Sequence, residues 1–277
     1  MSTPTTWRGS LTRPKSSETR KVSVPLSHFI EWKKVPDDQV DATMGRLGAI
    51  GVGDIVAHPE WAKRDPGDGT YLKMVHGAMK KHGVLSSACH GLWGEFDLNC
   101  PDEGRRQQIV SAHRRFLRAA AEMGCLTYTV HLGDGHPGQA RKSLDQLLPE
   151  AERAGMGIAM ENMISHDRSL ELAALAAEYA HPALGLCLDT GHAHAGEGLK
   201  TALENMSPYL FTCHLHDNDG RSDQHFPPGH GTIDWGFLVP AIKACPAIMT
   251  AETESGPCGA LDMAGIWALF QQAWDCK

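Results

Sequence analysis

The feature that most constrains the fold of this chain is a repeated unit of a short apolar strand, a polar loop and an amphipathic helix. Strands that alternate with helices form parallel βαβ units. Eight such units predict an α/β fold, a single closed (β/α)8 barrel of the TIM type, because closure leaves no exposed sheet edge. The predicted strands are Val22–Leu26, Asp54–Ala57, Val84–Cys89, Leu126–Val130, Gly157–Met160, Leu184–Leu188, Leu210–Cys213 and Ala247–Ala251.

The length of the chain and its helices fit one domain. Two helices are predicted over Asp102–Met123, where Pro101 suits a helix start, and over Ser169–Tyr179, which is rich in Ala and Leu. The chain has 277 residues, and barrels of this type commonly have about 250. We therefore expect the barrel to span residues 21–277. An open doubly wound sheet is the alternative, but Pro25–Glu31 lacks the Gly-rich turn of that fold.

Residues 1–20 differ from the rest of the chain. They are rich in Ser and Thr, hold four Arg or Lys and show no apolar period. This composition predicts a flexible N-terminal tail. A Ser/Arg-rich transit peptide is the alternative interpretation.

Composition disfavours several classes of partner. The formal net charge of -7 gives no basic surplus for nucleic acid, and no apolar run has the length of a membrane span. The eight cysteines form no CxxC pair, and several lie in apolar strands, so we expect reduced thiols in a cytoplasmic protein. A small-molecule substrate is expected, and a homo-oligomer is left open.

Metal-binding residue types end or occupy six consecutive predicted strands. They are His90, His131, Glu161, Asp189, His214 and Glu252. In a barrel these strand ends meet at one rim, where barrel enzymes place their active sites. Two loops add His192, Asp223 and His225.

A single histidine is more often hydrogen-bonded than a ligand. We apply that interpretation to the histidines in helical or surface stretches, His76, His82, His113 and His181. The joint pattern at the rim differs. Ionised carboxylates crowded together repel, and cations offset the repulsion. Imidazole mixed with carboxylate favours Zn, Mn, Co or Fe over Ca. The sequence therefore predicts a divalent metal site.

Aromatic side chains lie near the same rim. Trp61, Trp93 and Trp235 fall near predicted loop or strand ends, and His58 follows the second predicted strand. Two interpretations are open. These side chains could stack on a sugar, with His58, Trp61 and Trp93 as substrate contacts, or they could pack under loops.

Several short motifs together resemble the xylose isomerase-like barrel superfamily, which holds sugar isomerases and epimerases as well as endonuclease IV-type DNA repair enzymes. The resemblance covers roughly residues 21–270. The motifs are Glu161-Asn162, Cys187-Leu-Asp-Thr-Gly-His192, His214-Leu-His-Asp217, Asp223-Gln-His225, Gly229-His-Gly-Thr-Ile-Asp-Trp235 and Ala251-Glu-Thr253.

The resemblance implies one core metal held by two Glu, one Asp and one His. On this sequence those residues are Glu161, Asp189, His214 and Glu252. His216 points to the same strand face as His214. The superfamily's His-x-x-Asp pattern fits His214, so His216 is expected to touch substrate or a metal ligand.

Endonuclease IV-type enzymes imply two further zinc ions. Their additional ligands correspond to His90 and His131, which share Glu161, and to His192, Asp223 and His225. Related sugar enzymes often keep such histidines for substrate hydroxyl groups, so the expected number of ions is one to three.

Two functions follow from the resemblance. The first is a sugar isomerase or epimerase, in which Glu161 and Glu252 exchange a proton beside a carbonyl and His192 stabilises the developing oxyanion. Loss of a β-hydroxyl group would instead give a dehydratase. The second is trinuclear-zinc hydrolysis of a phosphodiester at abasic sites in DNA. The negative net charge favours the first.

Overall fold

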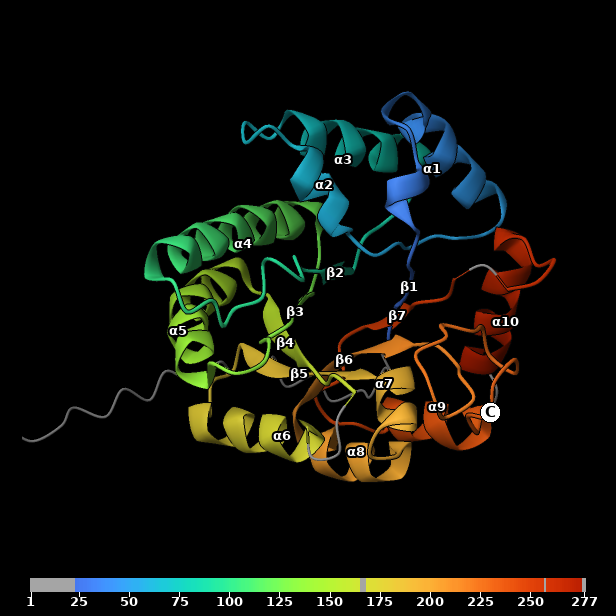
Figure 1. The fold of residues 1–277 in the computed structure, drawn as a ribbon. Coiled ribbons are helices and arrows are strands. Elements are labelled where there is room, and N and C mark those ends of the chain that lie inside the picture. The colour runs from blue at the N-terminus through green and yellow to red at the C-terminus, as the bar shows by residue number, and fades with distance from the viewer. Residues whose placement is uncertain (1–22, 165–167, 257, 276–277) are drawn as a thin grey trace, which may run out of the picture.

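The computed structural model describes residues 23–164, 168–256 and 258–275. Seven parallel strands form a nearly closed barrel with helices around it (Figure 1), which confirms the predicted single TIM barrel. The strand order is β1-β7-β6-β5-β4-β3-β2. The strands are β1 Leu26–His28, β2 Ala88–His90, β3 Thr127–Val130, β4 Gly157–Glu161, β5 Leu184–Asp189, β6 Leu210–Leu215 and β7 Ala251–Thr253.

The predicted second strand closes the gap between β1 and β2. Residues 54–57 make isolated parallel bridges, which pair Ile55 with His28 and Ala57 with Cys89. Val56 N donates to His28 O at 3.1 Å, and Ile55 N donates to Leu85 O at 2.9 Å. This segment therefore takes the place of an eighth strand, although it does not form a continuous ladder of hydrogen bonds with its neighbours.

The predicted bounds of three strands are wrong. The last strand was expected at 247–251, but a turn follows Cys245, and pairing with β1 begins only where Ala251 faces Leu26. The first strand lies at Leu26–His28 rather than 22–26, of which Val22 is outside the described residues. The third lies at Ala88–His90 rather than 84–89. The shift of β7 brings Glu254 to the rim.

The helices form a ring around the strands. The predicted helices 102–123 and 169–179 are confirmed as α4 and α6. Three 3-10 turns are η1 Trp32–Lys34, η2 Asp37–Gln39 and η3 Ser207–Tyr209. The α-helices are α1 Val40–Ala49, α2 Pro59–Arg64, α3 Thr70–His82, α4 Glu103–Met123, α5 Pro137–Ala154, α6 Arg168–Tyr179, α7 Thr190–Ala195, α8 Leu199–Met206, α9 Trp235–Lys243 and α10 Met263–Asp275.

Local chemistry fixes the ends of α4. The Asp102 side chain accepts a hydrogen bond from Arg105 N at 2.6 Å and caps the N-terminus. Gly124 ends the helix with φ 102°, a left-handed conformation that glycine adopts without strain. Buried side chains such as Ile109 and Phe116 form its inner face. The start and end of this helix therefore follow from its local sequence.

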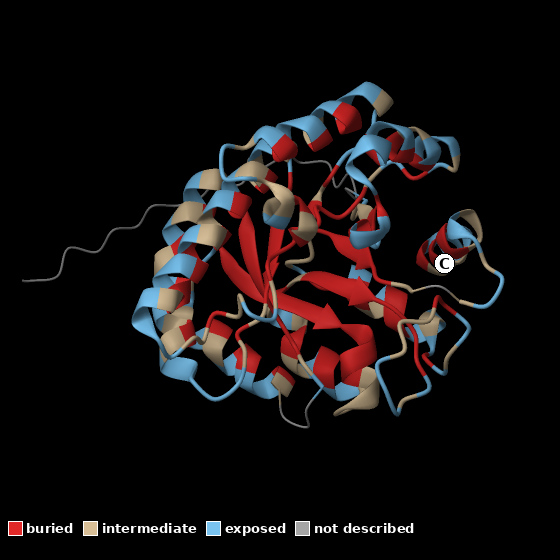
Figure 2. Ribbon diagram, turned by 45° about the horizontal axis from the view of Figure 1, so that its top comes forward, coloured by how far each residue is buried: buried red, intermediate tan, exposed pale blue. Residues whose placement is uncertain are grey.

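The strands are buried on both faces, as parallel strands between helices and a lumen must be (Figure 2). The lumen beneath the rim is partly polar. Thr127 and Thr212 each hydrogen-bond to Thr250 at 2.8 Å, and Thr212 donates to Glu252 at 3.3 Å. A row of hydroxyl groups thus leads up to Glu252.

Other expectations concern the rest of the chain. The predicted tail, residues 1–20, lies outside the described residues. Seven cysteines of the described part are free thiols, and Cys276 is outside it. No helix within the described ranges combines the length and apolar character needed to cross a bilayer.

Candidate metal centre

Parallel strands end at one rim and bring four of the predicted ligands together there, with Glu254, which was not predicted, beside them. His90 ends β2, Glu161 ends β4 and Asp189 ends β5. His214 lies in β6, and Glu254 follows β7. All five are buried. Such a concentration of ionisable groups is costly unless each is paired or binds a cation.

Glu161 is the centre of the first group of candidate ligands. Single ligand atoms of His90, Glu161 and His214 lie within 4.8 Å of one another. His131 joins them, because its Nε2 lies 2.9 Å from Glu161 Oε2. Burial raises the pKa of Glu161, but the adjacent His131 and His214 outweigh burial and leave that pKa well below its usual range. Glu161 is therefore an anion that two imidazoles face.

The second group surrounds one nitrogen of His214. Its Nδ1 lies 3.3 Å from Glu161 Oε2, 3.8 Å from Glu254 Oε2 and 3.9 Å from Asp189 Oδ2. Neither ring nitrogen of His214 has a hydrogen-bond partner among the described residues, although both are buried. Three carboxylates around an unpartnered imidazole nitrogen are the donor set that a divalent transition metal prefers. The residues present therefore fit a metal ion.

Burial also acts on the carboxylates of this group. It raises the pKa of Glu254 against the attraction of His214, and the Glu161 carboxylate adds to the rise. Without a cation, the group would tend to hold a proton. A metal ion would compete with that proton for the same oxygens.

The third group brings His192, Asp223 and His225 together. Asp223 Oδ2 is 3.3 Å from His192 Nε2 and 3.0 Å from His225 Nε2. His216 belongs here as well, since it forms a group of candidate ligands with Asp223 and His225 and its Nε2 lies 2.9 Å from Asp189. Although burial opposes protonation, the nearby carboxylates raise the pKa of His192 to about 10 and that of His225 to about 9.

Asp217 holds the loop that carries Asp223 and His225. Its carboxylate accepts hydrogen bonds from Gly229 N at 3.1 Å and Ile233 N at 3.0 Å. It also accepts one from the indole of Trp235 at 3.0 Å. Trp235 therefore packs beneath this loop.

A cavity of about 410 Å³ lies above these groups. Its walls include Phe29, Trp93 and Met163, and no Lys or Arg occurs among its described lining residues. His90, His131, Glu161, His192, Asp223, His225 and Glu254 also line it. The cavity has the size of a small-molecule site, with apolar walls and a polar floor.

The predicted substrate contacts are placed differently from one another. Trp93 lines the cavity, and its ring centroid lies 4.4 Å from that of His90. Trp61 is fully buried against Trp32, 5.2 Å away. His58 caps α2 by accepting a hydrogen bond from Glu60 N at 3.0 Å. Neither Trp61 nor His58 lines the cavity.

Glu252 and Glu254 occupy successive levels of β7 and the residues after it. Glu254 lines the cavity and joins a group of candidate ligands, whereas Glu252 does neither among the described residues. Instead, Glu252 Oε2 lies 3.5 Å from Nε2 of His214, on the far side of that ring. Glu254 was not among the residues predicted from the sequence. The Glu-x-Glu spacing was the available signal, because both residues face the same way.

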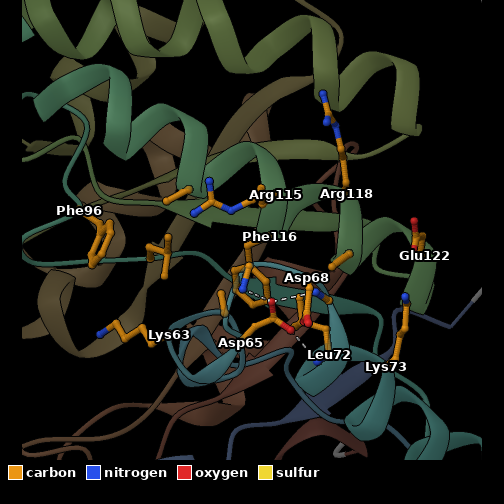
Figure 3. A pocket seen from close by; sticks show the side chains of 16 residues that line it. Lys63, Asp65, Asp68, Leu72, Lys73, Phe96, Arg115, Phe116, Arg118 and Glu122 are labelled. Atoms are coloured by element: carbon orange, nitrogen blue, oxygen red, sulfur yellow. Dashed lines mark hydrogen bonds between the residues drawn. The ribbon is translucent and has the colours of Figure 1, made fainter. Parts of the chain in front are cut away.

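A second cavity, of about 520 Å³, lies between the α2–α3 loop and α4 (Figure 3). Asp65 is at its centre, but the carboxylate already accepts hydrogen bonds from the backbone of Gly67, Gly69 and Tyr71. None of the groups of candidate metal ligands in the described chain includes its lining residues. The rim cavity is therefore the better candidate for chemistry.

Comparison with known sequences identifies relatives of two kinds. A probable endonuclease 4 of Mycobacterium leprae is 31% identical over 182 residues, which cover 56% of this chain and 69% of that protein. An uncharacterised protein of Sinorhizobium fredii, y4fM, is 32% identical over 107 residues. That match covers 37% of this chain and spans only about a third of the relative's length, 34%.

Solved structures share the whole fold. The 3-keto-D-glucoside 4-epimerase from E. coli superimposes with a TM-score of 0.74 at 16% identity, over 92% of this chain and 100% of that one. The pattern of the xylose isomerase-like TIM barrel family matches residues 46–267. This protein belongs to the xylose isomerase-like TIM barrel family.

Proposed function

We propose that this protein is a divalent-metal-dependent isomerase or epimerase that moves a proton beside the carbonyl group of a sugar or keto-sugar. The observation that carries the proposal is the placement of two buried carboxylates, Glu161 and Glu254, in one cavity. His90 Nε2 lies 3.8 Å from Glu161 Oε2 and 3.7 Å from Glu254 Oε1. The two carboxylates lie at the ends of different strands and so reach a substrate from two sides.

The proposed metal ligands are Glu161, Asp189, His214 and Glu254. Glu254 replaces Glu252, which was predicted from the sequence as the fourth ligand. A divalent ion held there would stabilise negative charge on two neighbouring oxygens of the substrate. Elemental analysis of the purified protein will identify the ion among Zn, Mn, Co and Fe. It will also count any further ions that His90, His131 and the third group hold.

The chain's own residues supply the proton transfer. One carboxylate of the Glu161–Glu254 pair accepts a proton from the carbon beside the carbonyl, and the other returns a proton. Return to the opposite face of the same carbon inverts it, which is epimerisation. Return to the neighbouring carbon is isomerisation. His192, which donates from Nδ1 to Asn162 O at 2.9 Å, presents Nε2 to the cavity near Asp223.

The cavity walls support a sugar-sized substrate. Phe29 and Trp93 offer aromatic faces for the C–H face of a sugar, and the described lining has no Lys or Arg to neutralise a phosphate. The E. coli epimerase of the same fold acts on a 3-keto-D-glucoside, so keto-sugars and their glycosides are the first compounds to test. The free thiols of the described chain agree with the expected cytoplasmic location.

The test follows solvent deuterium into the substrate. Protein loaded with Mn²⁺, Co²⁺ or Zn²⁺ is incubated in D₂O with ketohexoses and 3-keto-glucosides, and NMR is used to detect exchange beside the carbonyl. Exchange that is lost in Glu254→Gln but kept in Trp61→Phe supports the proposal. Absence of exchange across the panel, in protein that binds metal, overturns it.

A second candidate is phosphodiester hydrolysis at abasic sites in DNA. It is favoured by the convergence of all three groups of candidate ligands at one rim and by the match to the probable endonuclease 4 of M. leprae. The formal charge of -7 opposes it, as does the lack of Lys and Arg among the described cavity residues.

A further inference from the structure

We infer that Glu252 is a positioning residue of the metal centre: its carboxylate accepts the Nε2–H of His214 and so presents Nδ1 to the ion. The inference rests on the metal centre of the proposed function. It assigns Glu252 a role behind a ligand rather than a place among the ligands.

Two unpartnered polar atoms face each other at this point. Oε2 of Glu252 and Nε2 of His214 are 3.5 Å apart, and neither has a hydrogen-bond partner among the described residues. Both side chains are completely buried, so bulk water does not reach these atoms. A movement of a few tenths of an ångström would bring them to hydrogen-bond distance.

The chemistry of imidazole decides which nitrogen needs the carboxylate. A neutral imidazole carries one N–H, and a metal binds the nitrogen that lacks the proton. Nδ1 of His214 faces the carboxylates of Glu161, Asp189 and Glu254. The proton must therefore be on Nε2, where Glu252 is the acceptor within reach. Metal-bound histidines commonly donate their second N–H to a carboxylate in this way.

The barrel holds Glu252 in place. Its other oxygen, Oε1, accepts a hydrogen bond from Thr212 at 3.3 Å. Thr212 lies two residues before His214 in the same strand, β6, and it is bonded in turn to Thr250 at 2.8 Å. Glu252 is thus fixed by the strand that carries the histidine it orients.

Direct coordination by Glu252 fits the structure less well. The residue lies one level deeper than Glu254, and His214 stands between it and the other carboxylates. It is absent from every group of candidate ligands among the described residues. Its oxygens would reach the ion only if the His214 ring left its position.

The experiment measures metal binding rather than turnover. Metal-free wild type, Glu252→Gln, Glu252→Ala and Thr127→Val are titrated with Co²⁺, and both the Kd and the visible absorption bands are recorded. We expect the Kd of Glu252→Ala to rise by 10–100-fold, the usual effect of losing such a partner. Glu252→Gln keeps an acceptor oxygen without its charge, so its Kd should rise less. Both variants should show altered band intensities, because the imidazole is less well oriented.

Thr127→Val is the matched control. It removes a buried hydroxyl group from the same lumen, but its bond to Thr250 lies two links away from Glu252. Its Kd should stay within a factor of two of wild type. An equal loss in this variant would show that any disturbance of the lumen weakens binding, and would overturn the inference.

Thermal unfolding distinguishes a loss of metal binding from a loss of stability. Added Co²⁺ should raise the Tm of Glu252→Gln less than that of wild type, whereas the two metal-free proteins should differ little. If Glu252→Ala does not fold, the isosteric Gln variant decides. If both Glu252→Gln and Glu252→Ala keep the Kd and spectrum of wild type, the positioning role is refuted and the metal centre is not. Failure of wild type to bind Co²⁺ would instead refute the metal centre.

Discussion

The imidazole of His225 lies flat against that of His216, with ring centroids 4.0 Å apart and planes 1° apart. His225 reaches this position with a left-handed backbone, φ 52°, which a non-glycine residue adopts at some cost. Its Nε2 meets Asp223 at 3.0 Å. A strained residue held against a second imidazole and a carboxylate is typical of a functional site.

Replacement of His225 by Asn should lower the metal content per chain and reduce turnover at least tenfold. Asn tolerates the left-handed backbone better than Ala does, so the change removes the imidazole with little added strain. Elemental analysis and turnover are measured together. Loss of turnover at full metal content would assign His225 to substrate instead, and no change in either would leave it a structural role.

Replacement of Gly191 by Ala should displace His216 and destabilise the protein by about 1–3 kcal/mol. A Cβ atom at Gly191 would overlap the His216 ring, which is held against Asp189 at 2.9 Å. The control is Gly138→Ala on α5, where a Cβ meets nothing within 4 Å. Urea denaturation measures both. Equal stability of the two variants would contradict the predicted overlap.

Replacement of Glu161 by Gln should reduce turnover by roughly a hundred- to ten-thousand-fold, the range for loss of a general acid or base. The fold should persist, because Gln has the same shape. Circular dichroism and NMR-detected deuterium exchange into the substrate check the two parts. Retained exchange would exclude Glu161 from the proton transfer.

Acid should destabilise the protein through His113. This buried ring bonds to the Tyr128 hydroxyl at 3.0 Å and to Phe96 O at 2.9 Å. Burial lowers its pKa from 6.5 to about 4. The unfolded chain therefore binds the proton more tightly, and the free energy of unfolding falls as the pH drops from 6.5 towards 4. The full loss is about 3 kcal/mol.

The measurement is urea denaturation at pH 7.5 and pH 5.0, with His113→Gln as the variant. The Gln side chain cannot titrate, so the variant should lose less stability on acidification than wild type does. Equal pH dependence in both proteins would mean that other groups, such as the buried His28, account for it.

The purified protein should not nick a synthetic abasic duplex at a rate useful for repair. The expectation rests on the net charge of -7 and on a described cavity lining without Lys or Arg. The assay is run at low salt with added Zn²⁺. Efficient cleavage, abolished in Glu161→Gln, would make the hydrolase the leading function.

The barrel was predictable because its signals are local and repeated. Apolar strands such as Gly157–Glu161 are buried at every position, so they appear as apolar runs between polar loops. The end of β7 was not predictable in the same way. Residues 247–250 are nearly as apolar as a strand, but they lie in a turn and an irregular segment after Cys245.

The sequence predicts which residues lie at the rim of the barrel. It does not predict how deep in the barrel each of them lies. His90, Glu161, Asp189 and His214 follow from their place at strand ends. The choice between Glu252 and Glu254 depends on how far each strand is shifted along its neighbour, which side-chain alternation does not reveal. Likewise, the sequence allows Trp61 to stack on a sugar, but its side chain is buried against Trp32.

The spacing of Glu252 in β7 and Glu254 just after it also affects how the barrel closes. Glu252 pairs in register with Ser27 on one side and His214 on the other. A slip of two residues, roughly 6.6 Å, would preserve the inward and outward alternation and put Glu252 where Glu254 now stands. Apolar packing alone discriminates weakly between those registers. An ion alone would not discriminate between them, because Glu252 would offer it a carboxylate in the slipped register. The carboxylate behind His214 would discriminate, because Thr250 would then take the place of Glu252. The two carboxylates together would therefore select the correctly closed barrel during folding.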